Sequence, residues 1–593
     1  MILLFLFLLC CVRNVELQGS YEKVESRLTN FIETGVKPTD LDHILETLFV
    51  TNNEAEKNDV LCSVCRIVSG VALKARRDGF NRESLGNFSK EMCVLLSDFG
   101  YVTCTGYIEI ILDSLLYIID NKNDLTPERI CAIRFQTNNC QDSLYVPWNI
   151  DIPPGKSFFL EKENSKSAVN IIHLTDIHYD PLYEPKSEAV CNDILCCQST
   201  TGKPSSFTNE AGFWGDYRAC DMPWNSVEDL LEHINHQHSE VEYVYFTGDI
   251  ISHQVWNTSQ EYNKYYISKM LQKLQDSFGT IPVYPILGNH ESHPTDFYPP
   301  TEVTEPNLSI EWLFRFLAEE WSRWLPASTL ETIRRGGYYT VLVKPGFRII
   351  ALNSNVCFTY NVWLLFNDKD PYGQLQWLSD TLLEAEKNEE SVHILSHVPP
   401  GETECFQQWS HEFRRIIERF HGIISGQFNG HTHLDELKVF LNSVNNGEVL
   451  NVAFNGGSFT TFIGFNPSYR LYRATKQYAQ ILDYDQWTYN LSIANENPNK
   501  KPNWFKLYSF EDTYKFQAND LPSYRILLEN MTNNLNLVEE YRRLQGRNSS
   551  AVLNTNCNDK CLHDILCTIK TVEYNDLINC QHQVEKSPTK DEL

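Results

Sequence analysis

A short apolar run that ends in two metal-binding side chains is the feature that most constrains the fold of this 593-residue chain. Residues 171–174 are predicted to form a buried strand, and Asp176 and His178 follow directly after it. A carboxylate and an imidazole two residues apart at a strand end can hold one divalent metal ion. Many surface strands also end in Asp and His, so this pair alone does not establish a metal site.

The same pattern recurs four more times along the chain. Further strands are expected at 243–246, 283–287, 392–395 and 422–425. They lead to the strings Thr247-Gly-Asp249, Gly288-Asn-His-Glu291, Ser396-His397 and Gly430-His-Thr-His433. Amphipathic helices are expected at 226–236, 261–278, 375–387 and 412–420. Strands that alternate with helices predict an α/β layered sandwich, in which loops at the C-terminal strand ends form the site.

The order Asp-x-His, Gly-Asp, Gly-Asn-His, His and Gly-His-x-His resembles the signature of the calcineurin-like metallophosphoesterases over residues 169–465. The resemblance implies two β-sheets flanked by helices and two metal ions at the strand ends. The implied ligands are Asp176, His178 and His433 for one ion, Asn289, His397 and His431 for the other, and Asp249 as the bridge between both.

Neutral imidazoles dominate this ligand set, which favours two Zn²⁺ ions per chain over magnesium or calcium. Water shared between two such ions loses a proton near neutral pH or below, because metal coordination lowers its pKa. The expected reaction is therefore attack of a metal-bridging hydroxide on phosphorus.

The N-terminus predicts entry into the secretory pathway. Residues 1–20 contain the apolar run 2–12 followed by Gly19 and Ser20, as in a cleaved signal peptide, although the usual positive charge before the run is missing. No later stretch is predicted to span a membrane. Of the 18 cysteines, Cys10 and Cys11 lie in this segment, so the mature chain keeps an even number, as expected in an oxidising compartment.

Two further observations describe the surface. Sequons for N-glycosylation are present at Asn87, Asn257, Asn307, Asn490, Asn530 and Asn548. The formal net charge of −27 argues against a nucleic-acid partner, because a phosphate backbone would be repelled.

Six cysteines mark a separate N-terminal domain, predicted at 58–144. A zinc site at Cys62 and Cys65 would need a second close pair, and Cys131 and Cys140 are too far apart for that. The intervening residues have broad apolar helical faces, and the whole resembles a saposin B-type domain. The resemblance implies the pairs Cys62–Cys140, Cys65–Cys131 and Cys93–Cys104. The alternative is an ordinary disulfide-stapled helical prodomain.

A Pro-rich linker is expected at 145–168, and a helical Cys-rich C-terminal domain at 466–593. Spacing alone cannot settle how the remaining cysteines pair. The overall resemblance described next implies the pairs Cys191–Cys196, Cys197–Cys220, Cys357–Cys405, Cys557–Cys561 and Cys567–Cys580.

A saposin-type domain, a linker, a phosphoesterase domain and a Cys-rich helical tail, in this order, resemble the acid sphingomyelinase family. Strings such as Asp249-Ile-Ile-Ser-His253 and Ser396-His-Val-Pro-Pro-Gly401 also agree with it. The resemblance implies hydrolysis of sphingomyelin to ceramide and phosphocholine, with His290 and His253 as candidates to protonate the leaving group. The saposin-like domain would make peripheral contact with a membrane or lipoprotein surface.

Two alternatives remain open: a soluble nucleotide or other phosphodiesterase on the same scaffold, and a non-catalytic lipid-binding protein. The chain is expected to be a monomer. By resemblance it is secreted or lysosomal, but its C-terminal Lys590-Asp-Glu-Leu593 matches an endoplasmic-reticulum retrieval signal.

Overall fold

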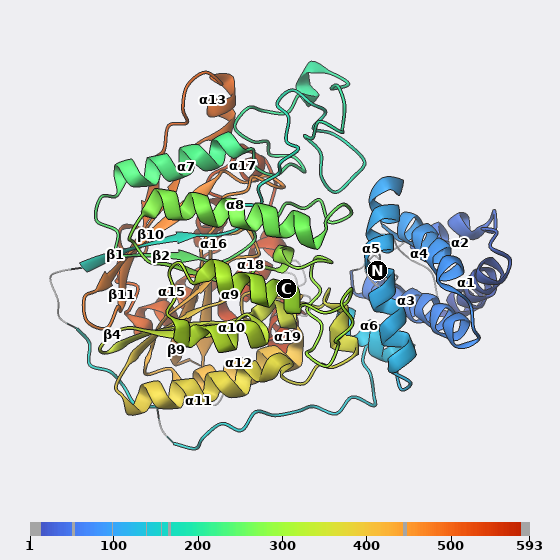
Figure 1. Ribbon diagram of the computed structural model, residues 1–593, viewed down its shortest axis with the longest axis horizontal. Coiled ribbons are helices and arrows are strands. Elements are labelled where there is room, and N and C mark those ends of the chain that lie inside the picture. The colour runs from blue at the N-terminus through green and yellow to red at the C-terminus, as the bar shows by residue number, and fades with distance from the viewer. Residues whose placement is uncertain are drawn as a thin grey trace, which may run out of the picture.

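The computed structural model describes residues 14–49, 54–97, 99–137, 139–155, 157–163, 168–442 and 447–582. Over these residues the chain forms an N-terminal group of helices, an α/β sandwich and a helical C-terminal segment packed on the sandwich (Figure 1). This arrangement confirms the predicted fold class. The retrieval sequence Lys590-Asp-Glu-Leu593 and residues 1–13 of the predicted signal segment lie outside the described residues.

The N-terminal helices share one apolar core. They are α1 (Asn14–Thr34), α2 (Leu41–Leu48), α3 (Glu54–Arg77), α4 (Arg82–Leu96), α5 (Tyr101–Asn121) and α6 (Pro127–Phe135). The side chain of Thr126 caps α6 by accepting a hydrogen bond from the backbone N–H of Arg129, and Pro127 begins the helix. Val24 and Leu28 of α1 and Leu45 of α2 are buried in this core, so the helical unit begins well before residue 58, the predicted domain boundary.

Helix α5 is the one described helix that is long and apolar enough to cross a membrane by length and composition. The expectation that no stretch after the signal segment has these properties was therefore wrong. Half of its most apolar window is buried inside the protein, and Cys104 near its N-terminus is bonded to Cys93 of α4. Its apolar side chains thus serve the helical core.

The first sheet has the strand order β12-β11-β10-β1-β2-β3. Its strands are β1 (Ala168–Leu174), β2 (Tyr243–Phe246), β3 (Val283–Pro285), β10 (Ser468–Thr475), β11 (Ile481–Thr488) and β12 (Phe505–Ser509). Strands β1, β2 and β3 are parallel, whereas β10 pairs antiparallel with β1. Residues 468–509 were grouped with the helical tail in the prediction, but they mostly complete this sheet.

The second sheet has the order β4-β5-β6-β7-β9-β8. Its strands are β4 (Tyr339–Lys344), β5 (Phe347–Ala351), β6 (Ser391–Leu395), β7 (Ile424–Asn429), β8 (Glu436–Leu441) and β9 (Val449–Asn455). Strands β5, β6, β7 and β9 are parallel. The parallel strands of both sheets deliver the polar loops that follow them to one edge of the sandwich.

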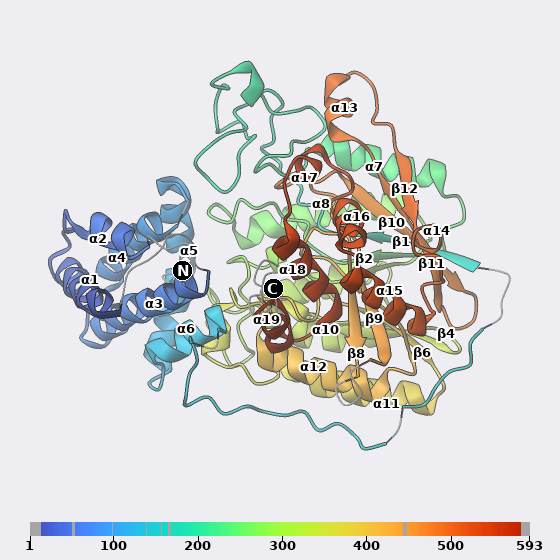
Figure 2. The same ribbon diagram turned by 180° about the vertical axis from the view of Figure 1, so that it is seen from behind.

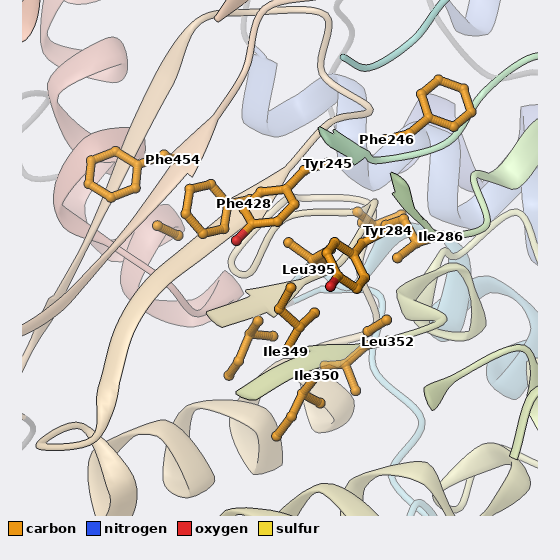
Figure 3. Packing of buried hydrophobic residues seen from close by; sticks show 14 of the residues in the cluster. Tyr245, Phe246, Tyr284, Ile286, Ile349, Ile350, Leu352, Leu395, Phe428 and Phe454 are labelled. Atoms are coloured by element: carbon orange, nitrogen blue, oxygen red, sulfur yellow. The ribbon is translucent and has the colours of Figure 1, made fainter. Parts of the chain in front are cut away.

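Side chains from both sheets pack into one core (Figure 3). Tyr245 of β2 and Phe428 of β7 meet with their ring centroids 5.0 Å apart. The helices of the sandwich are α7 (Trp224–Gln237), α8 (Gln260–Phe278), α9 (Glu311–Trp321), α10 (Leu330–Gly336), α11 (Gln374–Lys387) and α12 (Gln407–Phe420). Helices α7 and α8 lie on one side, and α11 and α12 on the other (Figure 1).

The helices of the C-terminal segment pack on both sheets of the sandwich. Its helices are α13 (Leu491–Glu496), α14 (Phe510–Tyr514), α15 (Leu521–Asn533), α16 (Leu535–Gln545), α17 (Ser550–Leu553), α18 (Asp559–Lys570) and α19 (Tyr574–His582). Helix α15 packs on β9, α18 on β8 and α19 on α12. A helical Cys-rich C-terminus is therefore confirmed, with α15 as the start of its compact helical part.

The N-terminal helices dock on one end of the sandwich (Figure 2). Tyr117 of α5 contacts Trp363, and Arg129 of α6 pairs with Asp368 at 2.9 Å. From there the linker runs along α12 and α11, where the backbone N–H of Ile150 donates to Glu412 at 2.8 Å. The linker is thus anchored along the sandwich before it enters β1.

Cysteines pair throughout the described residues. The disulfides are Cys62–Cys140, Cys65–Cys131, Cys93–Cys104, Cys191–Cys196, Cys197–Cys220, Cys357–Cys405, Cys557–Cys561 and Cys567–Cys580. These are the pairs that the resemblances implied.

Candidate active site

The side chains predicted as metal ligands converge at the shared edge of the two sheets. Asp176, His178 and His433 form one cluster, with the Nε2 atoms of the two histidines 3.1 Å apart. Asp249, His397 and His431 form a second cluster. The loops that carry them follow β1, β2, β6 and β7.

Asn289 and Asp249 join the two clusters. The Asn289 Oδ1 atom lies 2.9 Å from His397 Nε2 and 3.0 Å from His431 Nδ1. The Asp249 Oδ2 atom lies 3.3 Å from His178 Nε2 and 3.2 Å from His397 Nε2. One carboxylate oxygen therefore faces both clusters, as a bridging ligand would.

The hydrogen bonds of the histidines fit a cation-binding site. His178 Nδ1 is 2.8 Å from the carbonyl of Ile251, and His397 Nδ1 is 2.7 Å from the carbonyl of Thr247. A carbonyl can only accept, so both rings donate through Nδ1 and leave Nε2 with a lone pair. Both Nε2 atoms face the Asp249 carboxylate, so the space between them holds either protons on the rings or, when the rings are neutral, a divalent cation.

The electrostatics of the site also favour a positive charge. Burial opposes protonation of His178 and His397, but Asp249 raises the pKa of each to about 9. Burial lowers the pKa of His431 to about 3, so this imidazole is in the neutral form that binds metals. A metal ion would take the place of the protons that Asp249 attracts.

The ligands sit in tightly turned loops. Asp176, His178, Asp249, His431 and His433 all have positive φ, a conformation that is uncommon outside glycine and is found at functional sites. Their neighbours include two glycines whose position admits no side chain. A Cβ on Gly288 would lie 2.0 Å from Asp249 Oδ1, and one on Gly430 would lie 2.1 Å from Thr175 Oγ1. The glycines of the sequence strings thus allow the loops to approach each other.

Glu291 holds two of these loops together, a role that the sequence did not reveal. Its carboxylate accepts hydrogen bonds from the backbone N–H groups of Gly288 at 2.6 Å, Ile250 at 2.6 Å and Asp249 at 3.0 Å. The loop after β3 is thereby fastened to the loop after β2. The sequence shows Glu291 in the Gly-Asn-His-Glu string, but it does not show that backbone N–H groups of two loops bind its carboxylate.

The proposed proton donors, His253 and His290, lie beside the metal clusters. The His253 ring stacks between His178, at 4.1 Å, and Phe462, at 3.9 Å between ring centroids. Its Nδ1 atom is 2.9 Å from Asp221. His290 Nδ1 donates to the carbonyl of Ser252 at 3.2 Å. Both rings line the same pocket, with Nε2 left for a substrate.

The local environment sets the acidity of these rings. Burial lowers the pKa of His253, with the Asp221 carboxylate opposing it, and burial lowers that of His290 further. Asp221 stays ionised, because His253 and His178 outweigh the effect of its burial and lower its pKa. Sequence reasoning missed Asp221, because only the folded chain brings it to His253.

A pocket of about 400 Å³ opens over the metal clusters. Besides the ligands and the two histidines, its lining includes Asp296, Phe358, Tyr360, Glu404, Thr432, Phe462, Ile463 and Phe465. Arg134 of α6 stacks on the Tyr360 ring, 4.0 Å from its centroid, and lies 3.6 Å from Glu404. The N-terminal helices therefore contact the pocket wall directly.

The predicted glycosylation sites differ in exposure. Asn87, Asn257, Asn307 and Asn530 are exposed, whereas Asn490 and Asn548 are half-buried. The Asn490 side chain accepts a hydrogen bond from the backbone N–H of Ile493 and caps α13. Glycosylation at each sequon stays a prediction.

Fold and site together define a metal-dependent phosphoesterase of the calcineurin-like class, and the calcineurin-like phosphoesterase family model matches residues 169–435. Sphingomyelin phosphodiesterase of Bos taurus is 33% identical over 516 residues, which cover 86% of this chain and 81% of that one. The human sphingomyelin phosphodiesterase is 32% identical over 88% of this chain and 83% of its own. The chain belongs to the sphingomyelin phosphodiesterase family.

A second kind of relative matches a smaller part of the chain. The cyclic GMP-AMP phosphodiesterase of Mus musculus is 31% identical over 58% of this chain and 76% of its own. The similarity to the sphingomyelin phosphodiesterases extends well beyond the phosphoesterase domain, whereas this match covers little more than that domain.

Proposed function

We propose that the chain is a zinc-dependent phosphodiesterase that hydrolyses sphingomyelin to ceramide and phosphocholine. The observation that carries the proposal is the convergence of the predicted ligands around Asp249, combined with similarity to sphingomyelin phosphodiesterases over 86% of the chain. A non-catalytic lipid-binding protein would have no need of this ligand set.

The metal sites would be held by the residues described above. Asp176, His178 and His433 would bind one ion, Asn289, His397 and His431 the other, and Asp249 both. When bound, two zinc ions would supply Lewis acidity toward the phosphodiester oxygens and a nucleophilic water for attack on phosphorus. The nitrogen-rich donor set favours zinc.

His290 and His253 would supply the proton that the departing ceramide oxygen needs. Each has Nδ1 engaged by a fixed acceptor, so Nε2 carries a proton toward the substrate only in the imidazolium form. Burial disfavours this form in both rings, whereas Asp221 favours it in His253 and Asp249 favours it in His290. Asp221 fixes the orientation of the His253 ring and favours its protonated form. A positioned acid of this kind contributes about 10²–10⁴ in rate.

The part of the pocket lining that is not made of predicted metal ligands suits a cationic headgroup. Phe358 and Tyr360 contribute aromatic rings, and Glu404 contributes a carboxyl group. The Asp296 carboxyl also lines the pocket, and it accepts a hydrogen bond from Asn289 at 2.8 Å. Aromatic faces and carboxylates together recognise quaternary ammonium groups. Burial raises the pKa of Asp296 to about 7 and also raises that of Glu404, with Arg134 opposing the latter. A bound choline would favour the ionised forms.

The N-terminal helices would bring the pocket to a lipid surface, as a saposin B-type domain would, and the chain would act as a monomer in the secretory pathway or lysosome. The even number of mature cysteines supports an oxidising compartment. Retention in the endoplasmic reticulum through Lys590-Asp-Glu-Leu593 is the alternative location.

The test is product analysis from sphingomyelin vesicles, with and without a zinc chelator, from about pH 4.5 to 7.5, the range over which a histidine acid titrates. We expect phosphocholine and ceramide, and loss of both on chelation with recovery on adding zinc. The similarity to the cyclic GMP-AMP phosphodiesterase favours a soluble nucleotide substrate as the rival. Turnover of a cyclic dinucleotide without turnover of sphingomyelin would establish that rival.

A further inference from the structure

One side of the pocket mouth is formed by an apolar loop, residues 458–466, which we call the lip. Phe462, Ile463 and Phe465 of the lip all line the pocket. The base of the lip is fastened to the first metal loop, since the backbone N–H groups of Phe459 and Thr460 donate to the carbonyls of Thr175 at 3.1 Å and Asp176 at 2.9 Å. The lip is therefore held in a fixed position relative to the metal ligands.

The tip of the lip is exposed and strained. Ile463 is 66% exposed although it borders the pocket, and its φ is +59°. A β-branched residue in the left-handed region is a genuine outlier, and such strain persists where surrounding contacts enforce it. Here the Ile463 N–H donates to the carbonyl of Arg218 at 3.2 Å, and the next residue, Gly464, donates to Thr461 at 3.0 Å. The strained backbone places an apolar side chain in solvent, where little protein packing stabilises it.

Hydrogen bonds of Arg218 connect the lip to a second segment with an exposed apolar side chain, Phe207. The Arg218 guanidinium donates to the carbonyl of Thr208 at 3.0 Å, in the short helical turn η1 (Phe207–Asn209). Phe207 of this turn is 86% exposed. Arg218 thus links the lip to a turn that also presents an apolar group to solvent. This turn lies in the loop region 191–220, which contains the disulfides Cys191–Cys196 and Cys197–Cys220.

We propose that the lip, with Ile463 at its tip, and Phe207 enter the surface of the phospholipid bilayer that carries the substrate. This rests on the proposed function and adds a lipid contact on the sandwich itself, apart from the N-terminal helices. A lipid bilayer fits this position, because a lipid whose headgroup lies over the metal clusters leaves its apolar part at the mouth of the pocket, beside Ile463. Isolated apolar side chains fixed at such a rim gain free energy by leaving water for the acyl region.

The test uses the full chain with the substitution Ile463→Asn. Asparagine tolerates the left-handed conformation better than isoleucine does, so the variant should fold with an equal or higher Tm. We expect its affinity for phosphatidylcholine–sphingomyelin vesicles, measured by co-sedimentation with zinc chelated, to fall about tenfold. Turnover of vesicle-borne sphingomyelin should fall by a similar factor, and turnover of bis(p-nitrophenyl) phosphate by less than about threefold.

Three further variants sharpen the result. Ile526→Asn on α15 is the matched control, because Ile526 is also exposed, at 58%, but does not border the pocket. It should leave vesicle binding unchanged. Phe207→Ser should weaken vesicle binding without changing turnover of the soluble substrate, and Ile463→Leu should restore most of the binding that Ile463→Asn loses.

Three outcomes would overturn the proposal: unchanged vesicle binding in Ile463→Asn, equal losses on vesicle-borne and soluble substrates, or a change from dimer to monomer that makes the lip a self-association surface. A different outcome would overturn the proposed function. If the unmodified chain binds vesicles through the lip but releases no phosphocholine, the lipid contact stands and the sphingomyelinase activity does not.

Discussion

The two walls of the pocket differ in how the structure holds them. The metal wall is built from loops that follow strands of the sandwich, and Asp176, His178 and His397 are fully buried there. The outer wall comes from connecting segments, with Ile463 largely exposed and Tyr360 contacted by Arg134 of the N-terminal helices. The candidate metal ligands thus lie on loops of the sandwich, whereas segments outside its sheets line the rest of the pocket.

The largest effect is expected at the metal wall, from Asp249→Asn. An amide cannot supply the negative charge that both clusters share, so the metal affinity should fall. Because a metal ion contributes several kcal/mol to stabilising the transition state, the loss in kcat/KM should be on the order of 10⁴ or more. Zinc content and kcat/KM on a soluble phosphodiester are the measurements, and full activity in a zinc-depleted variant would contradict the assignment.

The next largest effect separates proton donors from metal ligands on the same wall. His290→Gln and His253→Gln should each lower kcat by about 10²–10⁴ while zinc content stays unchanged. The side chains of His178, His253 and His290 lie close enough to one another to bind a single metal ion. In this alternative, His253 and His290 would be metal ligands. Loss of zinc from either variant would move that residue into the ligand set.

A smaller effect is expected at the outer wall, from Arg134→Met. The half-buried Glu404 carboxyl would lose its nearby cation, its pKa would rise further, and its neutral form would attract choline less. KM for sphingomyelin should rise about three- to tenfold, as for a loss on the order of 1 kcal/mol. Arg129→Met is the control, since it disturbs the same helix at Asp368, away from the pocket. An equal effect of both variants would mean that only docking of the helices matters.

The last effect is on stability and leaves the chemistry of the pocket unchanged, and it concerns the sandwich that carries both walls. His393 is buried, accepts a hydrogen bond from the Tyr245 hydroxyl at 2.7 Å and donates to the carbonyl of Ala479 at 2.8 Å. Burial lowers its pKa to about 3, whereas the unfolded chain binds the proton near pH 6.5. Stability is therefore lost as pH falls below about 6.5, by about 2 kcal/mol at pH 5 from this residue.

His393→Gln should remove this part of the acid sensitivity, although it also lowers stability at neutral pH. Urea unfolding at pH 7 and pH 5 would measure it, with the exposed His43→Gln as control. An unchanged difference between the two pH values in His393→Gln would show that the acid sensitivity has another source.

The metal wall could be predicted from the sequence because the residues that mark each ligand are its neighbours in the chain. Each ligand follows an apolar run, and the glycines that permit close approach stand beside it, as Gly288 does beside Asn289. Asp221 beside the metal wall, and Glu404 and Phe462 on the outer wall, could not be predicted. Each gains its role only through a partner far away in the chain.

Strand β10 shows the same limit at the level of the fold. Its Arg470 is fully buried and pairs with Asp435, so the strand lacks the apolar run that marked the others. Helices α1 and α2 were missed for a different reason, because the cysteines that marked the N-terminal domain begin only at Cys62.

The central claim is that Asp249 joins two neighbouring cations at the edge shared by both sheets. Anomalous scattering from crystals of the zinc-loaded chain tests it most directly. We expect two ions per chain about 3.5–4 Å apart, with Asp249 a ligand to both. A single ion, or two ions in separate pockets with no shared carboxylate, would contradict the account.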